Sequence, residues 1–158
     1  MNLIWRHPSG GRLWQGDHAD TLRWTGLLQT KVKLVILAAI EHQPKLPSCF
    51  DVIRVRLDDN PEMEADEATM TERASRKAAD LAWKCLSAGM DVLSSCYAGR
   101  NRSGIVSAMI LIKFCDMSAN QAIAKVRRAR LNALTNPEFV RILKRVYMMR
   151  QNRVARRV

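Results

Sequence analysis

A cysteine and two arginines share one short polar loop, in the stretch SSCYAGRNRSGIVSAMILI (residues 94–112). Cys96 is followed by an arginine at the sixth position, Arg102, and Gly99 lies between the two. A short apolar run enters the loop and a long one leaves it, so the loop is expected to join a buried strand to a buried helix. Such a turn gathers backbone N–H groups at a helix N-terminus, where they can hold an anion the size of phosphate.

The thiol decides which chemistry such an anion site would support. Because Cys96 is expected beside a helix N-terminus and arginine side chains, it should ionise to the nucleophilic thiolate at neutral pH. A thiolate could attack the phosphorus of a bound phosphate monoester, while Arg102 holds two of the phosphate oxygens. The product would be a cysteinyl-phosphate, which water hydrolyses in a second step. A buried apolar cysteine is the ordinary alternative, and the glycine, arginine, asparagine and serine near Cys96 argue against it.

This spacing belongs to only one of the four cysteines. Cys49, Cys85 and Cys115 have valine, aspartate and glutamine at the sixth position, where Cys96 has arginine. The phosphate-loop pattern GxxxxGK followed by serine or threonine is absent from the sequence, so hydrolysis of nucleoside triphosphates is not the first expectation. The sequence has no CxxC pair and no metal-ligand spacing, so we expect neither a metal nor another cofactor.

Strands and helices are predicted to alternate along the chain, which is typical of an α/β domain with a mostly parallel sheet. We expect a single domain whose central sheet has about four or five strands flanked by helices. In such sheets ligands bind beyond the carboxyl ends of the strands, where the loop after the last predicted strand lies. The predicted strands are Leu3–Arg6, Arg12–Gln15, Lys33–Ala39, Val52–Leu57 and Val92–Ser94.

Each predicted helix has a recognisable start or face. Residues 17–29 are expected to be helical, and Ser103–Phe114 is apolar nearly all round and therefore expected to be buried. Capping boxes, in which serine or threonine precedes glutamate or glutamine by three residues, predict three further helix starts. The boxes are Thr69 with Glu72, Ser118 with Gln121, and Thr135 with Glu138, the last with Pro137 in the first turn. The first box opens a helix that ends at Gly89, with the apolar stripe Met70, Ala74, Ala78, Leu81 and Cys85.

Composition and charge limit the partners and the compartment. The 158 residues carry a net charge of +11, much of it in KVRRAR (125–130) and in residues 141–157. Such a surface favours anionic partners, among them RNA and acidic lipid, although solvated helix faces are the simpler interpretation. Cysteines without pairing patterns indicate a reducing compartment, the cytoplasm. The longest apolar run, Ile105–Cys115, falls short of the roughly 20 residues that a membrane span needs, and no signal peptide is recognisable.

At the loop the sequence resembles the cysteine-based protein tyrosine phosphatases, most closely their compact dual-specificity branch. The likeness covers most of the chain and rests on C-x-x-G-x-x-R-S, from Cys96 to Ser103, together with GRLWQGDHAD (11–20), KLVILAAIE (33–41), VIRVRLDD (52–59) and VRRARLNALTNPEFVRIL (126–143). It implies a phosphatase-type fold over residues 1–150, followed by a basic tail at 151–158. It also implies that Cys96 is the nucleophile, that Arg102 holds the phosphate and that Ser103 hydrogen-bonds to the departing thiolate. The cradle would be lined by the backbone N–H groups of Tyr97, Ala98, Gly99, Arg100, Asn101 and Arg102.

The reaction also needs an acid that protonates the leaving oxygen. The resemblance places an aspartate just after the strand that precedes the long helix, and the register of residues 55–59 favours Asp59. Asp58 and Asp66 are the alternatives in the same acidic loop, part of which is expected to be solvated. Ser95 departs from the family pattern, which usually has a histidine there that supports the loop and the thiolate. We interpret the three histidines, His7, His18 and His42, as surface or turn residues, because none lies near the motif in sequence.

These features predict a metal-independent phosphomonoester hydrolase that acts on phosphotyrosine, with phosphoserine and phosphothreonine proteins as further candidates. Two alternatives remain in the same superfamily: Arg100 is similar to the lysines in phosphoinositide phosphatase loops, and NRSG (101–104) is similar to the NRTG of phosphatases acting on RNA 5′-phosphate ends. A third is a catalytically weak phosphate-binding module, because Ser95 replaces the usual histidine. A disulfide between Cys96 and Cys49 or Cys85 is left open, and both partners are expected to be buried apolar cysteines.

Overall fold

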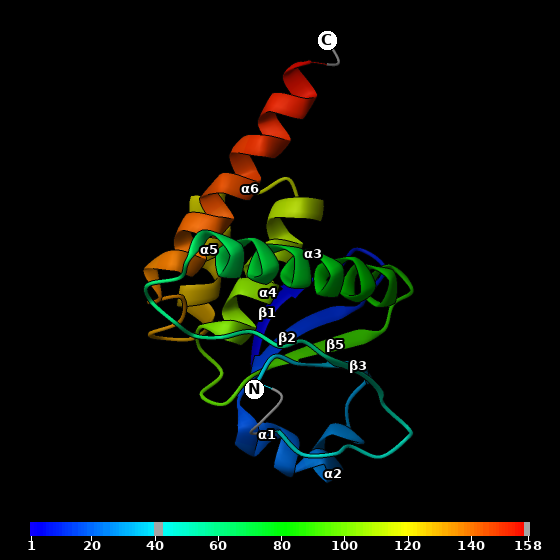
Figure 1. Cartoon of the computed structure of the whole chain (residues 1–158). Helices are drawn as coiled ribbons and strands as arrows, with labels where there is room; N and C mark the ends of the chain where they lie inside the picture. Colours follow the sequence, from blue (N-terminus) through cyan, green and yellow to red (C-terminus); the bar gives the residue numbers. More distant parts are fainter. Residues whose placement is uncertain (40–42, 157–158) are drawn as a thin grey trace.

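A five-stranded sheet forms the centre of the computed structural model, which describes residues 1–39 and 43–156 (Figure 1). The strand order is β1-β2-β5-β3-β4, and β1 is antiparallel to β2 while the other neighbours are parallel. The predicted α/β class and mostly parallel sheet are therefore confirmed. The strands are β1 (Asn2–Arg6), β2 (Arg12–Gly16), β3 (Val32–Leu37), β4 (Asp51–Arg54) and β5 (Asp91–Ser95).

Helices cover both faces of this sheet (Figure 1). The short helices α1 and α2 lie on one face, and the four longer helices lie on the other. The side chains of β3 alternate accordingly, because Leu34 and Ile36 join the core under the longer helices while Val35 and Leu37 join the smaller core on the opposite face. The helices are α1 (His18–Leu22), α2 (Trp24–Leu27), α3 (Ala65–Ser87), α4 (Arg102–Phe114), α5 (Ala119–Ala129) and α6 (Pro137–Ala155).

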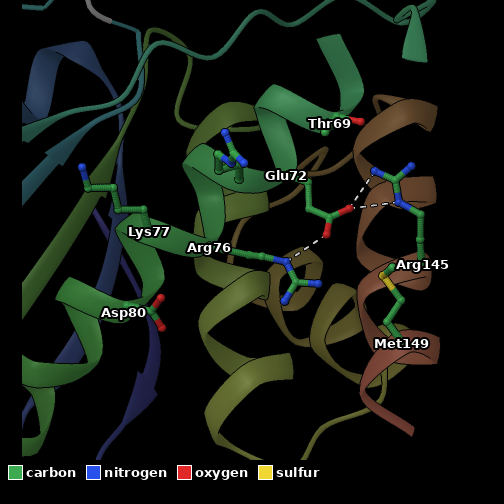
Figure 2. A pocket seen from close by; sticks show the side chains of 8 residues that line it. Thr69, Glu72, Arg76, Lys77, Asp80, Arg145 and Met149 are labelled. Atoms are coloured by element: carbon green, nitrogen blue, oxygen red, sulfur yellow. Dashed lines mark hydrogen bonds and ion pairs between the residues drawn. The ribbon is translucent and has the colours of Figure 1, made fainter. Parts of the chain in front are cut away.

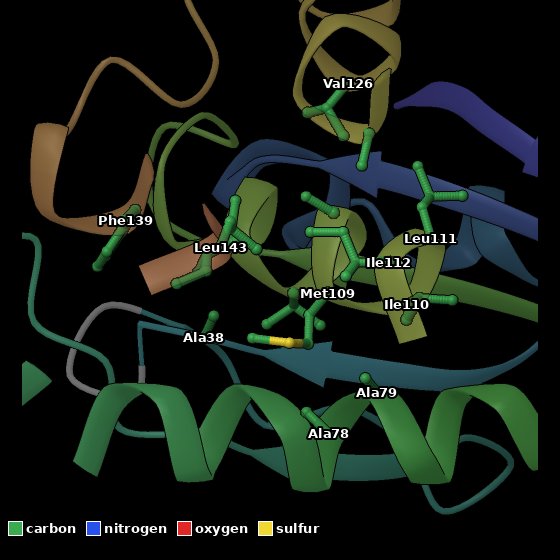
Figure 3. Packing of buried hydrophobic residues seen from close by; sticks show 14 of the residues in the cluster. Ala38, Ala78, Ala79, Met109, Ile110, Leu111, Ile112, Val126, Phe139 and Leu143 are labelled. Carbon is green, nitrogen blue, oxygen red and sulfur yellow. The ribbon is translucent and has the colours of Figure 1, made fainter. Parts of the chain in front are cut away.

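The helix α4 is the centre of the larger core, as its apolar sequence predicts. Every residue from Ser103 to Ile112 is buried. Met109 and its neighbours in α4 belong to the same buried cluster as Ala78 and Ala79, the small side chains that α3 contributes (Figure 3). Small residues let two helices approach closely, so this packing fixes the position of the N-terminus of α4 at Arg102.

The predicted start of α3 is wrong by about one turn. The helix begins at Ala65 rather than at Thr69, because the residues before Thr69 include good helix formers and place Asp66 and Glu67 in the favourable first turn. The hydroxyl of Thr69 lies inside the helix and donates to the Ala65 carbonyl oxygen at 2.8 Å. Met70, expected in the apolar stripe, is 73% exposed. The buried face is shifted to Ala68, Thr71, Ser75, Ala78, Ala79, Ala82 and Leu86.

One of the two later capping boxes is correct. Ser118 and Gln121 make both reciprocal hydrogen bonds at the start of α5. Thr135 does not cap α6: the cap is Asn136, whose side-chain oxygen accepts from the N–H groups of Glu138 and Phe139, with Pro137 in the first turn. Asparagine is at least as good a cap as threonine, so the better cap next to the proline prevails.

Two other elements are shorter than predicted. Residues 17–29 form α1 and α2 rather than one helix, and a continuous helix would gain little because Leu22 and Leu28 are more than half exposed. The edge strand β4 ends at Arg54, although Val55 and Leu57 remain buried as the chain turns into the acidic loop.

The C-terminal helix, by contrast, extends through Ala155 and projects beyond the body of the molecule, so most of the expected basic tail is helical (Figure 1). Within the described residues, no helix is both long and apolar enough to cross a bilayer.

Candidate active site

The loop after β5 lies at the carboxyl edge of the sheet, between the central strand and the buried helix α4. In the sheet register, Ser95 is aligned with Gly16 of β2 and with Leu37 of β3, so the three parallel strands end at the same level. Residues 96–101 then form the loop, and Arg102 is the first residue of α4. The predicted position of the loop at this edge is therefore what the structure shows.

The Cys96 thiol lies at the base of this loop. It is 2% exposed, and its sulfur is 3.3 Å from the hydroxyl oxygen of Ser103, which is itself fully buried. Both residues are next to the N-terminus of α4, where the helix dipole favours negative charge. The Cys96 sulfur and the Ser103 hydroxyl thus form a buried hydrogen-bonded pair.

Two side chains hold backbone carbonyl oxygens of the loop from outside. The buried side chain of Gln15 donates to the Gly99 carbonyl oxygen at 3.0 Å, and Arg130 donates to the Ala98 carbonyl oxygen at 3.1 Å. In a trans peptide the N–H points away from the carbonyl, so the N–H groups of Gly99 and Arg100 are directed away from these two anchors. This is the orientation that an anion cradle needs.

Gly99 is the one position in the loop that requires glycine. Its φ is +64°, in the left-handed region, and an added Cβ would lie 2.6 Å from the Gly16 carbonyl oxygen and 2.7 Å from Arg130. Of the other predicted cradle residues, Tyr97, Ala98 and Arg100 are exposed, and Asn101 and Arg102 are partly buried.

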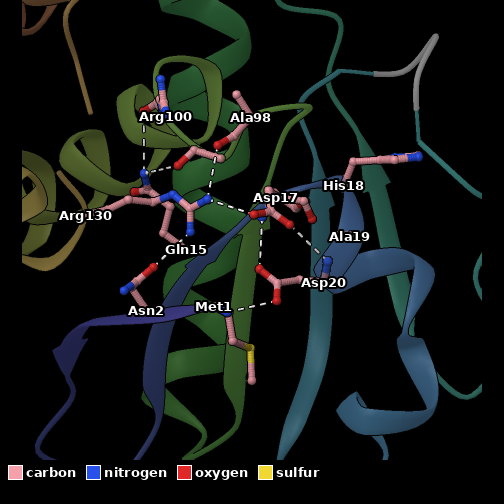
Figure 4. Close-up of polar contacts among 12 residues, drawn as sticks. Met1, Asn2, Gln15, Asp17, His18, Ala19, Asp20, Ala98, Arg100 and Arg130 are labelled. Carbon is pink, nitrogen blue, oxygen red and sulfur yellow. Dashed lines mark hydrogen bonds and ion pairs between the residues drawn. The ribbon is translucent and has the colours of Figure 1, made fainter. Parts of the chain in front are cut away.

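An ion pair supports the start of the loop (Figure 4). Arg130, at the end of α5, donates to Asp17 at 2.9 Å, to the Ala98 carbonyl oxygen, and to the side chain of Asn2 at 2.8 Å. Burial alone would raise the pKa of Asp17, but the hydrogen bond and charge of Arg130, together with backbone N–H groups, outweigh it and hold that pKa below its usual 3.8. No local sequence pattern predicts this role of Arg130, because its partners Asn2 and Asp17 are far away in sequence.

The hydroxyl of Ser95 has two partners in place of the histidine ring that the family pattern would have there. It donates to the Asp17 carbonyl oxygen at 3.0 Å and accepts from Gln43 at 3.0 Å. Gln43 in turn accepts from the Ala39 N–H at 2.7 Å, which ties the end of β5 to the end of β3. Because Ser95 is fully buried, it acts as a structural link below the loop.

Of the three aspartates that the sequence offers as the acid, Asp59 is the one that is hydrogen-bonded to the loop. One carboxylate oxygen accepts from the side-chain amide of Asn101, in the loop itself, at 3.2 Å. The other accepts from the amide of Asn136, the cap of α6, at 2.9 Å. Asp58 is exposed and Asp66 is exposed in the first turn of α3, and among the described residues neither is hydrogen-bonded to the loop.

The acidic loop that contains Asp59, the loop of residues 96–101 and the start of α6 are therefore one hydrogen-bonded unit. The Asn101 side-chain oxygen accepts from the backbone N–H of Thr135 at 2.9 Å, and Asn136 also donates to the Asn60 carbonyl oxygen at 3.1 Å. Asn136 could have been found from sequence, since an asparagine before a proline is a strong helix start. Its contact with Asp59 could not, because 76 residues separate it from that loop.

His18, interpreted from the sequence as a surface or turn residue, lies next to the loop. The ring of His18 stacks on Tyr97 with the ring centres 5.9 Å apart, and the His18 backbone N–H donates to the Tyr97 carbonyl oxygen at 3.1 Å. This pair flanks the loop at the end nearest Cys96. His7 packs instead against Trp5 and Trp83, and His42 lies outside the described residues.

Solved structures share this arrangement of elements. Human DUSP28 aligns over 97% of this chain and 99% of its own, with a TM-score of 0.81 and 21% identity. The human tyrosine phosphatase-like serine/threonine/tyrosine-interacting protein aligns over 88% and 93%, with a TM-score of 0.76 and 18% identity. PTPMT1, solved in complex with PI(5)P, aligns over 95% and 97%, with a TM-score of 0.71 and 21% identity. This chain has the dual-specificity phosphatase fold. No family model and no curated protein matches its sequence, so the likeness is one of fold.

Within the dual-specificity phosphatase fold, the other cysteines lie away from Cys96. Cys49 and Cys85 precede β4 and β5, at the amino edge of the sheet, and Cys96 follows β5 at the carboxyl edge, roughly 15 Å away along the strand. All four are free thiols, and Cys49 is exposed rather than buried as expected. Burial, with the charge of Asp51, raises the pKa of Cys85, and burial raises the pKa of Cys115 to about 11. Among the described residues, no group of three or more histidine, cysteine, aspartate or glutamate side chains could hold a metal ion.

Proposed function

We propose that this protein is a cysteine-dependent phosphomonoester hydrolase. One observation carries the proposal: the buried Cys96 thiol lies 3.3 Å from Ser103 at a helix N-terminus, in a loop whose Asn101 holds the carboxylate of Asp59. A nucleophile, an anion cradle and an acid thus meet at one edge of the sheet. The dual-specificity phosphatase fold of the chain supports the same conclusion.

The reaction proceeds in two steps. The Cys96 thiolate attacks phosphorus, the bond from phosphorus to the leaving oxygen breaks, and Asp59 gives that oxygen its proton. Asp59, now ionised, takes a proton from water as the water oxygen attacks the cysteinyl-phosphate. The phosphorus–sulfur bond breaks, inorganic phosphate leaves, and the Ser103 hydroxyl donates to the departing thiolate.

Phosphate binding uses the loop and its arginine. The N–H groups of Tyr97–Arg102 surround the phosphate oxygens, and the Arg102 guanidinium at the start of α4 grips two of them. These donors are fixed before substrate arrives, because Gln15 and Arg130 hold the loop carbonyl oxygens. Preorganised donors of this kind stabilise the charge that moves during transfer.

Phosphotyrosine proteins are the proposed substrates, and phosphoserine and phosphothreonine proteins are further candidates. The exposed Tyr97 beside His18 offers an aromatic surface at the mouth of the site. A phosphoinositide is the first alternative, because the structurally similar PTPMT1 was solved with PI(5)P and Arg100 is exposed on the loop. RNA 5′-phosphate ends are the second, because the surface is strongly basic. Relative rates on a phosphotyrosine peptide, inositol phospholipids and 5′-triphosphorylated RNA separate the three.

We also propose the cytoplasm as the compartment, where the four free thiols remain reduced.

The proposal is tested by hydrolysis of a small aryl phosphate, with chelator present, across about pH 5 to 8. Cys96→Ser should lower turnover by at least roughly 10⁴-fold, because it removes the nucleophile with little change of shape. Asp59→Asn should lower it roughly 10²- to 10⁴-fold for a poor leaving group, and much less for a good one that needs no proton. Asp58→Asn is the matched control and should leave turnover unchanged.

A catalytically weak phosphate-binding module is the second candidate, and Ser95 favours it. The serine leaves the loop without the imidazole that the family pattern would provide below Cys96. If the unaltered protein binds vanadate or phosphate but turns over no aryl phosphate, the hydrolase proposal is wrong and the binding module is correct.

A further inference from the structure

A groove of about 570 Å³ lies between α3 and α6, outside the catalytic loop (Figure 2). A smaller hollow of about 180 Å³ continues it and shares the side chains of Arg76 and Met149. We call the two together the α3–α6 trough. Within residues 1–39 and 43–156, seven cationic side chains and two carboxylates line it. The cations in its larger part are Arg73, Arg76, Lys77 and Arg145.

Both carboxylates in the trough are already bound by cations. One oxygen of Glu72 accepts from Arg76 at 2.9 Å, and the other accepts two hydrogen bonds from Arg145, at 2.9 and 2.6 Å (Figure 2). Asp80 pairs with Lys113. Arg73 and Lys77 are exposed, and neither forms an ion pair with any residue in 1–39 or 43–156. The trough therefore presents positive charge that the described part of the chain does not neutralise.

The trough leads away from the acid loop. Asn60 donates to Glu67 in α3 at 3.3 Å and accepts from Asn136 at the start of α6, so both helices begin beside Asp59. At a rise of 1.5 Å per residue, Lys77 lies roughly 18 Å along α3 from Ala65. An extended peptide covers that length with about five or six residues.

We propose that the α3–α6 trough docks an acidic segment of the phosphoprotein substrate. The inference rests on the proposed function, in that the docked segment belongs to the chain whose phosphorylated residue enters the catalytic loop. Carboxylates of the segment would pair with Arg73 and Lys77, and its apolar side chains would contact Met149. The sequence around the phosphorylated residue would then contribute to specificity through KM.

The chemistry of the trough favours a peptide over other anionic partners. Among the described residues, no aromatic side chain lines either hollow, so unpaired bases would find no stacking surface there. Glu72 and Asp80 in the lining disfavour a continuous phosphate backbone, whereas a peptide can place neutral residues opposite them. The hollow is concave, which suits an extended chain better than the plane of a membrane.

Steady-state kinetics test the proposal with Arg73→Gln/Lys77→Gln, a pair that keeps the helix-forming character of α3. The substrates are phosphotyrosine peptides with a run of glutamates starting about six residues before or after the phosphotyrosine, and the same peptides with glutamine. For at least one acidic peptide, the variant should raise KM roughly three- to tenfold with kcat unchanged. The glutamine peptides and a small aryl phosphate should show no change, and the effect should shrink at about 0.5 M salt. Arg23→Gln/Lys31→Gln, two exposed cations that lie outside α3 and α6, is the control of equal charge.

A binding measurement distinguishes failure of the docking proposal from failure of the hydrolase proposal. Fluorescence polarisation of the unphosphorylated acidic peptide needs no turnover. If no aryl phosphate is hydrolysed, yet the peptide binds the unaltered protein more tightly than the trough variant, the hydrolase proposal fails and the docking site stands. Equal binding to the trough variant, the control variant and the unaltered protein overturns the docking site. So does a trough variant that weakens binding of single-stranded RNA or of phosphatidylserine vesicles while the acidic peptide is unaffected.

Discussion

The two sides of the loop that contains Cys96 are held by different kinds of bond. At its start, the charged side chain of Arg130 pairs with Asp17 at 2.9 Å and also holds a loop carbonyl oxygen. At its end, the neutral amides of Asn101 and Asn136 each donate to one oxygen of Asp59, at 3.2 and 2.9 Å. One side is fixed by an ion pair and the other by amides.

The difference fits the tasks that the proposed reaction gives to the two carboxylates. Asp17 has a structural task, and its partners hold its pKa low, so it stays ionised at every pH at which the protein would work. Asp59 must give and take a proton in each cycle of the proposed reaction. A cation beside it would favour only the ionised form, whereas an amide orients the group with less bias toward its charge. Rigid support and an adaptable acid are thus separated along one short loop.

Among substitutions in the two supports of the loop, the largest loss of stability is expected from Arg130→Met, on the side of the ion pair. The substitution removes three hydrogen bonds and leaves the Asp17 carboxylate without its cation, so the free energy of unfolding should fall by about 2 kcal/mol. Loss of the anchor at Ala98 should also lower kcat/KM roughly tenfold, because the cradle is no longer held in shape. Urea denaturation and aryl phosphate kinetics measure the two effects.

Two further variants show whether the losses of stability and of kcat/KM in Arg130→Met come from the geometry of the guanidinium or from its charge. Arg130→Lys keeps the charge but cannot reach Asn2, Asp17 and Ala98 together, so it should recover only part of both losses. Arg128→Met removes an exposed arginine from the same helix and should change neither quantity. Full recovery in the lysine variant would mean that the fork of hydrogen bonds is unimportant.

A smaller effect is expected at the amide side, from Asn101→Ala. The variant removes one donor to Asp59 and the acceptor for the Thr135 N–H, so the free energy of unfolding should fall by about 1 kcal/mol. With a poor leaving group kcat should fall roughly tenfold, since the acid is no longer positioned, and with a good one it should change little. Asn120→Ala, an exposed asparagine of α5, is the control.

Comparing kcat for good and poor leaving groups shows whether Asn101 positions the acid. If Asn101→Ala slows good and poor leaving groups equally, Asn101 supports the phosphate cradle and not the acid. The contrast between the two sides of the loop would then be lost.

What the sequence predicts well about the site is local. Cys96, Arg102 and Ser103 lie within eight residues, and the buried helix that follows them is apolar on every side, so the loop and its position after a central strand follow from spacing alone. The mostly parallel sheet follows from the alternation of strands and helices. Asp59 required the family resemblance as well, because the acidic loop contains several carboxylates.

What the sequence could not predict is the support around the loop. Arg130 meets Asp17 across 113 residues, and Gln15 meets Gly99 across 84. Such contacts depend on how helices and strands pack, and no local pattern encodes them. The two wrong helix starts have a different cause: at Thr69 and Thr135 a capping box was present, and stronger local preferences one residue or one turn away prevailed.

The smallest effect is expected in the pH dependence of the free energy of unfolding, to which the ion pair of Asp17 with Arg130 contributes. Because the pKa of Asp17 is lower in the folded protein than the 3.8 of a free aspartate, its charge stabilises the fold above about pH 4 and ceases to do so as the pH falls through the lowered pKa. The unaltered protein should therefore be more stable than Asp17→Asn at pH 6, and the gap should narrow steadily below about pH 4. The same comparison is made in proteins that also carry Arg130→Met, in which Asp17 lacks the arginine that lowers its pKa. There the difference in the free energy of unfolding caused by Asp17→Asn should be smaller at pH 6 and should change less as the pH falls. Urea denaturation from about pH 6 to 2 measures all four proteins, and a gap that is constant across this range would show that the ion pair contributes nothing to the support of the loop.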